Sequence, residues 1–219
     1  MLSSITIYST QYYMMNATDK IKDDIFNLVN KYADIKYQEK IFEPNKSFIP
    51  VSGKVIDKHE IKFIVESALD GWLTTGRFND EFEKRLSSFL GVKYLLTTNS
   101  GSSANLLAFA CLKLKKGSEV ITPTLTFSTT VAPIYQLGLI PHFIDVDKNN
   151  FVANIEQIVK AINKKTKAII IPNLLGNVPD WKKIHKISKK YDLKIIEDSA
   201  DTIGYKLYQS NFGNFSDIT

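Results

Sequence analysis

The chain has 219 residues, of which 44% are hydrophobic and 23% are charged, and its formal net charge is +5. This composition is that of a soluble globular protein, and the scattered lysines that supply the charge argue against a nucleic-acid-binding patch. No apolar run is long enough to span a bilayer, residues 1–15 do not resemble a secretory signal, and the lone Cys111 cannot form an internal disulfide, so we expect a cytoplasmic protein.

The first part of the chain is predicted to be mainly helical. Apolar residues recur at helical spacing over residues 17–40, and a Pro-containing linker follows over 43–53. Two shorter helices are predicted over 58–70 and 79–90, joined by an extended loop over 71–78.

From residue 94 onward the pattern alternates between short β-branched segments and helical segments. Strands are expected over residues 94–98, 119–122, 140–146, 168–171 and 194–197, and helices over 102–114, 128–137, 155–162 and 181–191. Such βαβ units form a mostly parallel sheet with helices on its faces. The sequence therefore predicts an α/β domain built on a buried, mostly parallel sheet.

The junction between the first expected strand and the next helix is predicted to bind a phosphate. Residues Asn99–Asn105 include Gly101, Ser102 and Ser103, small residues that leave backbone N–H groups accessible at the positive end of a helix dipole. Neither the glycine fingerprint of a Rossmann oxidoreductase nor the lysine of a Walker loop is present. An ordinary N-cap and tight turn is the alternative interpretation.

Two further strand ends carry residues that suit a phosphorylated aromatic cofactor. Phe127 offers a flat face and Asp198 a carboxylate, and ligands of parallel sheets bind beyond the carboxyl ends of the strands. Pyridoxal or pyridoxamine phosphate needs an anion site, a stacking surface and a carboxylate that keeps its ring nitrogen protonated. Taken singly, Phe127 could be a core residue, and Asp198 could cap a turn or pair with a lysine. The three histidines show no metal-ligand spacing, and no metal site is expected.

Four segments carry a family resemblance: residues 49–56, 69–80, 97–107 and 197–201. They resemble the DegT/DnrJ/EryC1/StrS family of pyridoxal-phosphate enzymes of fold type I, which act on nucleotide sugars. More narrowly, they are similar to the CDP-4-keto-6-deoxy-D-glucose 3-dehydrase branch, the RfbH type of lipopolysaccharide and O-antigen deoxysugar biosynthesis. The helix at 17–40 resembles the N-terminal extension of that branch. The resemblance implies an N-terminal extension over residues 1–48 and, over residues 49–219, part of a three-layer α/β/α large domain.

This resemblance implies a role for each candidate site residue. The cofactor phosphate would be held by Gly101, Ser102 and Ser103. The ring would be stacked on Phe127, paired through its nitrogen with Asp198, and flanked on its hydroxyl side by Asp201. The substrate entrance would be lined by Thr74, Thr75 and Gly76.

The resemblance covers only the N-terminal half of a family member and implies an incomplete large domain. The catalytic residue, a lysine in the aminotransferases and a histidine in the 3-dehydrases, is expected beyond Thr219. The resemblance implies a nucleotide-sugar substrate, CDP-linked in this branch. The implied partners are a second copy in a homodimer and an iron–sulfur flavin reductase. The alternatives are a nucleotide-sugar aminotransferase and a non-catalytic remnant or split-gene piece.

The family fold also sets expectations for the sheet. In fold type I the first of seven strands is separated from the middle strands by the sixth and seventh. The strand at 94–98 would then lack a neighbour, and residues 213–219 would begin the sixth strand. We therefore expect a phosphate corner poorly held against Asp198, and a chain that by itself binds the cofactor weakly or not at all and is inactive.

Overall fold

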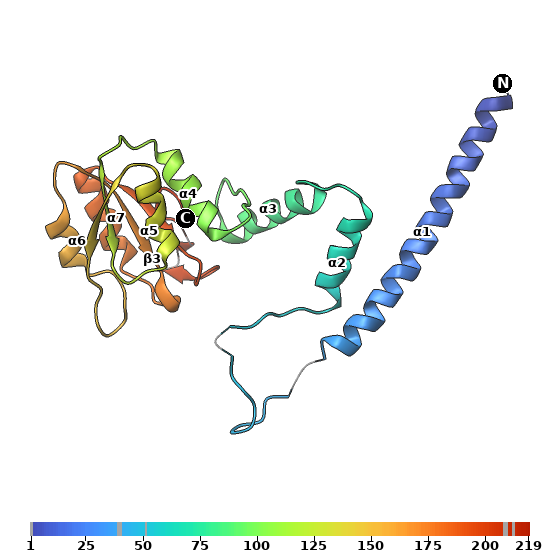
Figure 1. Ribbon diagram of the computed structural model, residues 1–219, viewed down its shortest axis with the longest axis horizontal. Coiled ribbons are helices and arrows are strands. Elements are labelled where there is room, and N and C mark those ends of the chain that lie inside the picture. The colour runs from blue at the N-terminus through green and yellow to red at the C-terminus, as the bar shows by residue number, and fades with distance from the viewer. Residues whose placement is uncertain (1, 39–40, 51, 208–209, 212) are drawn as a thin grey trace. The chain divides into compact units, whose positions relative to one another are not determined.

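The computed structural model describes residues 2–38, 41–50, 52–207, 210–211 and 213–219 (Figure 1). The chain divides into two compact units, Met1–Phe78 and Asn79–Thr219. These units are defined by how compactly the chain packs and not by where the family domain begins. The predicted domain boundary between residues 48 and 49 therefore stays a prediction. In the described part of the chain, every helix is too short or too polar to cross a membrane.

The first unit contains a long helix and a shorter one that pack together. Helix α1 spans Leu2–Lys36 and helix α2 spans Lys58–Leu69. The first helix begins well before the expected residue 17, because the sequence contains no glycine or proline in this stretch to interrupt it. Helix α2 begins at a capping box, in which the Asp57 carboxylate accepts a bond from the His59 N–H at 2.6 Å and Glu60 accepts one from the Asp57 N–H at 2.7 Å.

The second unit is built on a four-stranded parallel sheet with the order β2-β1-β3-β4. Its strands are β1 (Glu119–Pro123), β2 (Ile140–Ile144), β3 (Thr166–Pro172) and β4 (Lys194–Asp198). Its helices are α4 (Gly101–Leu112), α5 (Ser128–Gln136), α6 (Ile155–Ala161) and α7 (Trp181–Tyr191), and helix α3 (Arg77–Leu90) spans the boundary between the units. Three short elements complete the described chain: η1 (Leu174–Gly176), β5 (Lys206–Leu207) and β6 (Ser210–Asn211).

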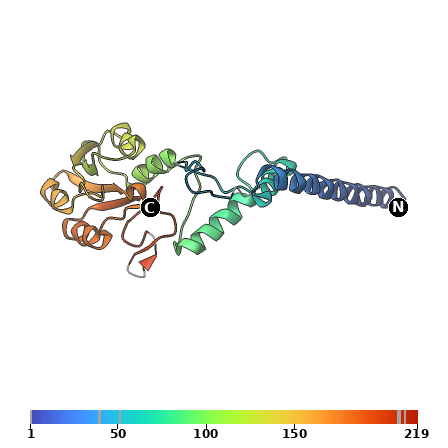
Figure 2. The ribbon, with the colours of Figure 1, turned by 90° about the horizontal axis from the view of Figure 1, so that it is seen from below.

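Successive strand residues face two different layers of helices. Ile169 of β3 packs in one core with Trp181 of α7, whereas the neighbouring Ile170 packs in a second core with Phe109 of α4 and Ile134 of α5. Figure 2 shows the sheet edge-on, with helices above and below it. The central strands are rich in isoleucine because both of their faces are buried. The prediction of an α/β/α domain is confirmed.

Residues 94–98 do not form the strand that their sequence predicts. The side chains of Tyr94 and Leu96 are 79% and 84% exposed. Thr97 is held from α3, because the Glu83 carboxylate accepts its backbone N–H at 2.7 Å and its hydroxyl at 2.9 Å. A strand needs a neighbour for its backbone groups, and no described strand pairs with this segment. The prediction of a strand at 94–98 is therefore wrong. The reason is the missing neighbouring strand, which the family fold led us to expect.

The last residues of the chain continue the sheet beside β4. Ile218 forms a parallel bridge with Ile196. Its carbonyl accepts the N–H of Glu197 at 2.9 Å, and its own N–H donates to the carbonyl of Ile195 at 3.2 Å. These bonds agree with the expectation that residues 213–219 lead into the next strand.

A buried hydroxyl in β1 gives a test of the packing. Thr122 is 0% exposed, and its hydroxyl has no hydrogen-bond partner among the described residues. Because an unpaired buried hydroxyl costs about 1–3 kcal/mol, we expect Thr122→Val to raise the free energy of unfolding by about 1 kcal/mol in urea titrations. The matched control is Thr166→Val, which removes a buried hydroxyl that accepts the Asn163 N–H at 3.0 Å and should lower stability. A Thr122→Val chain less stable than the unaltered one would contradict this account.

Candidate functional site

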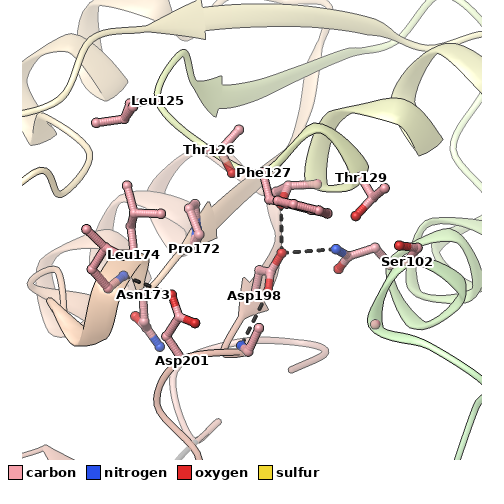
Figure 3. Close-up of a pocket in the computed structure, with 15 residues that line it drawn as sticks. Ser102, Leu125, Thr126, Phe127, Thr129, Pro172, Asn173, Leu174, Asp198 and Asp201 are labelled. Atoms are coloured by element: carbon pink, nitrogen blue, oxygen red, sulfur yellow. Dashed lines mark hydrogen bonds between the residues drawn. The ribbon is translucent and has the colours of Figure 1, made fainter. Parts of the chain in front are cut away.

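A pocket of about 560 Å³ lies at the carboxyl ends of β1, β3 and β4, beside the N-terminal ends of α4 and α5 (Figure 3). Its walls are formed by Gly101, Ser102, Asn105, Leu125, Thr126, Phe127, Thr129, Thr130, Pro172, Asn173, Leu174, Leu175, Asp198, Ala200 and Asp201. The pocket brings together Gly101, Ser102, Phe127, Asp198 and Asp201, five of the residues that the sequence singles out.

The N-terminus of α4 offers two backbone N–H groups to this pocket. Ser100 caps the helix: its hydroxyl accepts the Ser103 N–H at 3.2 Å, and its carbonyl accepts the Ala104 N–H at 3.0 Å. The N–H groups of Gly101 and Ser102 have no partner in the described chain, and both residues line the pocket. An anion could therefore bind at Gly101 and Ser102, at the positive end of the helix dipole. Ser103 does not line the pocket, and its N–H is taken by the cap, so its part in holding the phosphate stays a prediction.

Asp198 stands at the end of β4 and is held by side chains from two helices. Its Oδ2 atom accepts a bond from Nδ2 of Asn105 in α4 at 3.0 Å and a bond from the hydroxyl of Thr130 in α5 at 2.8 Å. Its Oδ1 atom accepts the Ala200 N–H at 3.4 Å. Figure 3 shows these bonds converging on the carboxylate. The Asn105 bond holds the N-terminal end of α4 against β4, contrary to the expected loose corner.

Phe127 presents its ring to the pocket and not to a core. It occupies the N-cap position of α5 in an extended conformation, and its side chain is 69% exposed. An apolar ring that stays exposed while lining a pocket has a face available for a planar ligand. The alternative of a core phenylalanine is therefore excluded.

Asp201 supports the opposite wall of the pocket. Its carboxylate accepts the N–H of Leu175 at 2.9 Å, and Leu175 has a φ of 55°, which residues other than glycine rarely adopt. Asp201 thus holds the η1 turn in place after β3, a contact that the sequence did not indicate.

A buried polar network lies beneath the pocket, centred on Asn173 and Glu197. Nδ2 of Asn173 donates to Oε1 of Glu197 at 2.9 Å and to the Thr202 hydroxyl at 2.9 Å, while its Oδ1 accepts the Trp181 indole N–H at 2.9 Å. Burial raises the pKa of Glu197, and this effect exceeds the opposite effect of the hydrogen bonds to its carboxylate. Burial, followed by the nearby Glu197 charge, raises the pKa of Tyr205.

Several pocket residues were missed by the sequence analysis. Asn105 follows Gly101 by one helical turn and Thr130 follows Phe127 at helical spacing, so each falls on the same helix face as a predicted residue. That spacing is the signal that could have identified them. Asn173 follows the expected strand at 168–171, but we assigned it no role from the sequence, because its partners come from three separate segments.

The predicted substrate residues lie in the first compact unit and do not line the pocket. Thr74, Thr75 and Gly76 form a loop in which the Thr75 carbonyl accepts the Trp72 indole N–H at 2.8 Å. The guanidinium of Arg77, at the end of this loop, pairs with the carboxylates of Glu66 and Asp70, each at 2.8 Å. The role of Thr74, Thr75 and Gly76 in substrate binding stays a prediction. No cluster of metal ligands occurs among the described residues.

The fold and this site define a class of protein, the pyridoxal-phosphate enzymes of fold type I. The structure resembles E. coli GDP-4-keto-6-deoxy-D-mannose-3-dehydratase with bound hydrated PLP, with a TM-score of 0.71 and 35% identity, covering 76% of this chain and 44% of that one. It also resembles the PMP form of the putative sugar aminotransferase Spr1654 from Streptococcus pneumoniae, with a TM-score of 0.73 and 29% identity, covering 77% of this chain and 46% of that one.

Sequence comparison then gives the family. Residues 54–219 match the DegT/DnrJ/EryC1/StrS aminotransferase family, and the chain belongs to it. Over 208 residues the chain is 45% identical to the lipopolysaccharide biosynthesis protein RfbH of Salmonella typhimurium, covering 91% of this chain and 48% of that protein. The chain spans about half the length of the curated relatives that it matches.

The buried Glu197 gives a test by pH. Because burial raises its pKa in the folded chain, the folded chain binds this proton more tightly than the unfolded chain, whose glutamate has a pKa of about 4.3. The stability of the unaltered chain relative to Glu197→Gln should therefore be greatest at low pH and fall as the pH rises above about 4.3. Urea unfolding of both chains across pH 4–8 measures this difference. A difference that is constant or grows with pH would refute the argument.

Proposed function

We propose that this chain provides the cofactor-binding half of a PLP- or PMP-dependent nucleotide-sugar enzyme, a 3-dehydratase of a CDP-linked 4-keto-6-deoxy sugar. The observation that carries this proposal is that one pocket brings together an exposed aromatic ring, a fixed carboxylate and two N–H groups that have no partner among the described residues. A phosphorylated, protonated pyridine ring uses all three groups, and few other ligands do.

The residues present fit the cofactor at each end. The N–H groups of Gly101 and Ser102 would bind the phosphate, since the helix dipole favours an anion there. Phe127 would stack on one face of the ring. Asp198 would hold a proton on the ring nitrogen, because a fixed carboxylate pairs strongly with a pyridinium. The hydroxyl of Thr126, which has no partner among the described residues although its residue lines the pocket, remains available to a ligand.

The chemistry that bound PLP or PMP supplies is an electron-accepting ring and a carbonyl or amine that reacts with substrate. This chain's own residues would bind and orient the ring and keep its nitrogen protonated. The residues that line the pocket include no lysine or histidine. We therefore assign cofactor binding to this chain and leave substrate proton transfer to groups outside the pocket lining.

The comparisons favour a 3-dehydratase over an aminotransferase as the reaction type. The identity to the 3-dehydratase structure is 35%, against 29% for the sugar aminotransferase, which supports the dehydratase branch. Loss of the C3 hydroxyl from a 4-keto sugar requires electrons to complete the deoxygenation, for which the proposed partner is an iron–sulfur flavin reductase. The proposed assembly is a homodimer. A nucleotide-sugar aminotransferase is the alternative, supported by the aminotransferase relative.

Cofactor binding can be tested with pyridoxamine phosphate, which has no aldehyde and cannot be trapped by surface lysines. The sequence alone led us to expect weak or no binding by this chain, because the phosphate corner would be poorly held. Since Asn105 holds that corner against Asp198, we now expect the chain to bind pyridoxamine phosphate in calorimetric titrations. Asp198→Asn should raise the Kd at least about ten-fold because the pyridinium loses its charged partner. Pyridoxamine without the phosphate should also bind at least about ten-fold more weakly.

The matched control is Asp192→Asn, which makes the same chemical change at the exposed C-cap of α7. Asparagine tolerates the left-handed conformation of this position, so the Kd should not change. The proposed function fails if the unaltered chain does not bind pyridoxamine phosphate, or if Asp198→Asn binds it as tightly as Asp192→Asn does.

A further inference from the structure

We infer that Asn105 and Thr130 are positioning residues that together hold Oδ2 of Asp198 and leave Oδ1 as the oxygen that receives the ring nitrogen of the cofactor. The inference rests on the proposed function and concerns side chains to which the sequence analysis gave no role.

The two oxygens of Asp198 have unequal surroundings. Oδ2 accepts two short bonds, from Asn105 at 3.0 Å and Thr130 at 2.8 Å, whereas Oδ1 accepts one long bond from the Ala200 N–H at 3.4 Å. A carboxylate oxygen has about two acceptor sites, so Oδ2 is filled and Oδ1 keeps capacity for a donor. A pyridinium N–H would therefore bind at Oδ1, unless it displaced Asn105 or Thr130.

Each of the two bonds also joins β4 to a helix that carries another part of the site. Asn105 belongs to α4, whose first turn supplies the N–H groups of Gly101 and Ser102. Thr130 belongs to α5, whose N-cap is Phe127. The two bonds thus fix where the phosphate corner and the stacking ring lie relative to the carboxylate (Figure 3).

Of the two bonds, the Asn105 bond has the larger part in positioning its helix, because no paired strand anchors α4 on its N-terminal side. Residues 94–98 precede α4 and form no strand. The core contacts of α4 come from Ala108 and Phe109, near its C-terminal end. Nearer its N-terminal end, Asn105 of α4 reaches the sheet through its bond to Asp198, which spans 93 positions of sequence.

The first experiment measures the Kd for pyridoxamine phosphate in variants that remove one bond each. Asn105→Ala and Thr130→Val should each weaken binding about ten-fold or more, because each removes a hydrogen bond to a charged group. Thr130→Ser keeps the hydroxyl and should bind within about two-fold of the unaltered chain. Thr122→Val makes the same hydroxyl-to-methyl change away from Asp198 and should leave the Kd unchanged.

Two further readouts separate positioning from a general structural effect. The ultraviolet absorbance of bound pyridoxamine phosphate reports the protonation of its ring, and in Asn105→Ala and Thr130→Val it should shift toward the spectrum seen in Asp198→Asn. In the cofactor-free chain, double-mutant cycles of Asn105→Ala or Thr130→Val with Asp198→Ala should show a coupling of about ten-fold in the unfolding equilibrium constant.

The outcomes distinguish this inference from the proposed function. A coupling factor near one in both double-mutant cycles overturns the inference, regardless of the Kd values measured for pyridoxamine phosphate. Unchanged affinity and spectra in Asn105→Ala and Thr130→Val also overturn it, because the ring nitrogen would then not depend on a held carboxylate. Binding lost in Asp198→Asn but kept in these two variants leaves the proposed function standing and the inference refuted.

Discussion

The parallel alignment of β1, β3 and β4 is the constraint on which the rest of the site depends. Parallel strands end at the same edge of a sheet, so the segments that follow them meet there. The register pairs Pro172 of β3 with Asp198 of β4, which brings the η1 turn beside the carboxylate. Helices α4 and α5 both pack on the core that contains Phe109 and Ile134, and their N-terminal ends reach this edge.

Beneath the pocket, a polar network holds the ends of the strands in position, as the apolar cores hold the helices on the two faces of the sheet. Asn173 connects the end of β3 to Glu197 in β4, to Thr202 in the following loop and to Trp181 at the start of α7. Burying a carboxylate is unfavourable, and these bonds offset only part of that cost. The network fixes relative positions in a region where apolar packing alone would leave the strand ends free to shift.

Most of the second unit was predictable because the residues within each helix or strand determine which of the two it forms. The buried strands and the residues Gly101, Phe127 and Asp198 follow from periodicity, turn chemistry and the family motifs. The strand at 94–98 was wrong because strand formation depends on a neighbour, which a local pattern cannot supply. Asn105, Thr130 and Asn173 escaped prediction because their partners are distant in sequence and are brought close only by the tertiary fold.

The unpaired segment at 94–98 has a consequence for how the site would come apart. Cooperative opening in proteins follows the units that share packing and backbone pairing. The sheet and its two cores form one such unit. The first turn of α4 lies outside these cores and has no paired strand before it, and Asn105, one turn later, is bonded to Asp198 of the sheet. Heating would therefore free the anion-binding end before the β4 end, so the two halves of the pocket would separate while the sheet remained folded.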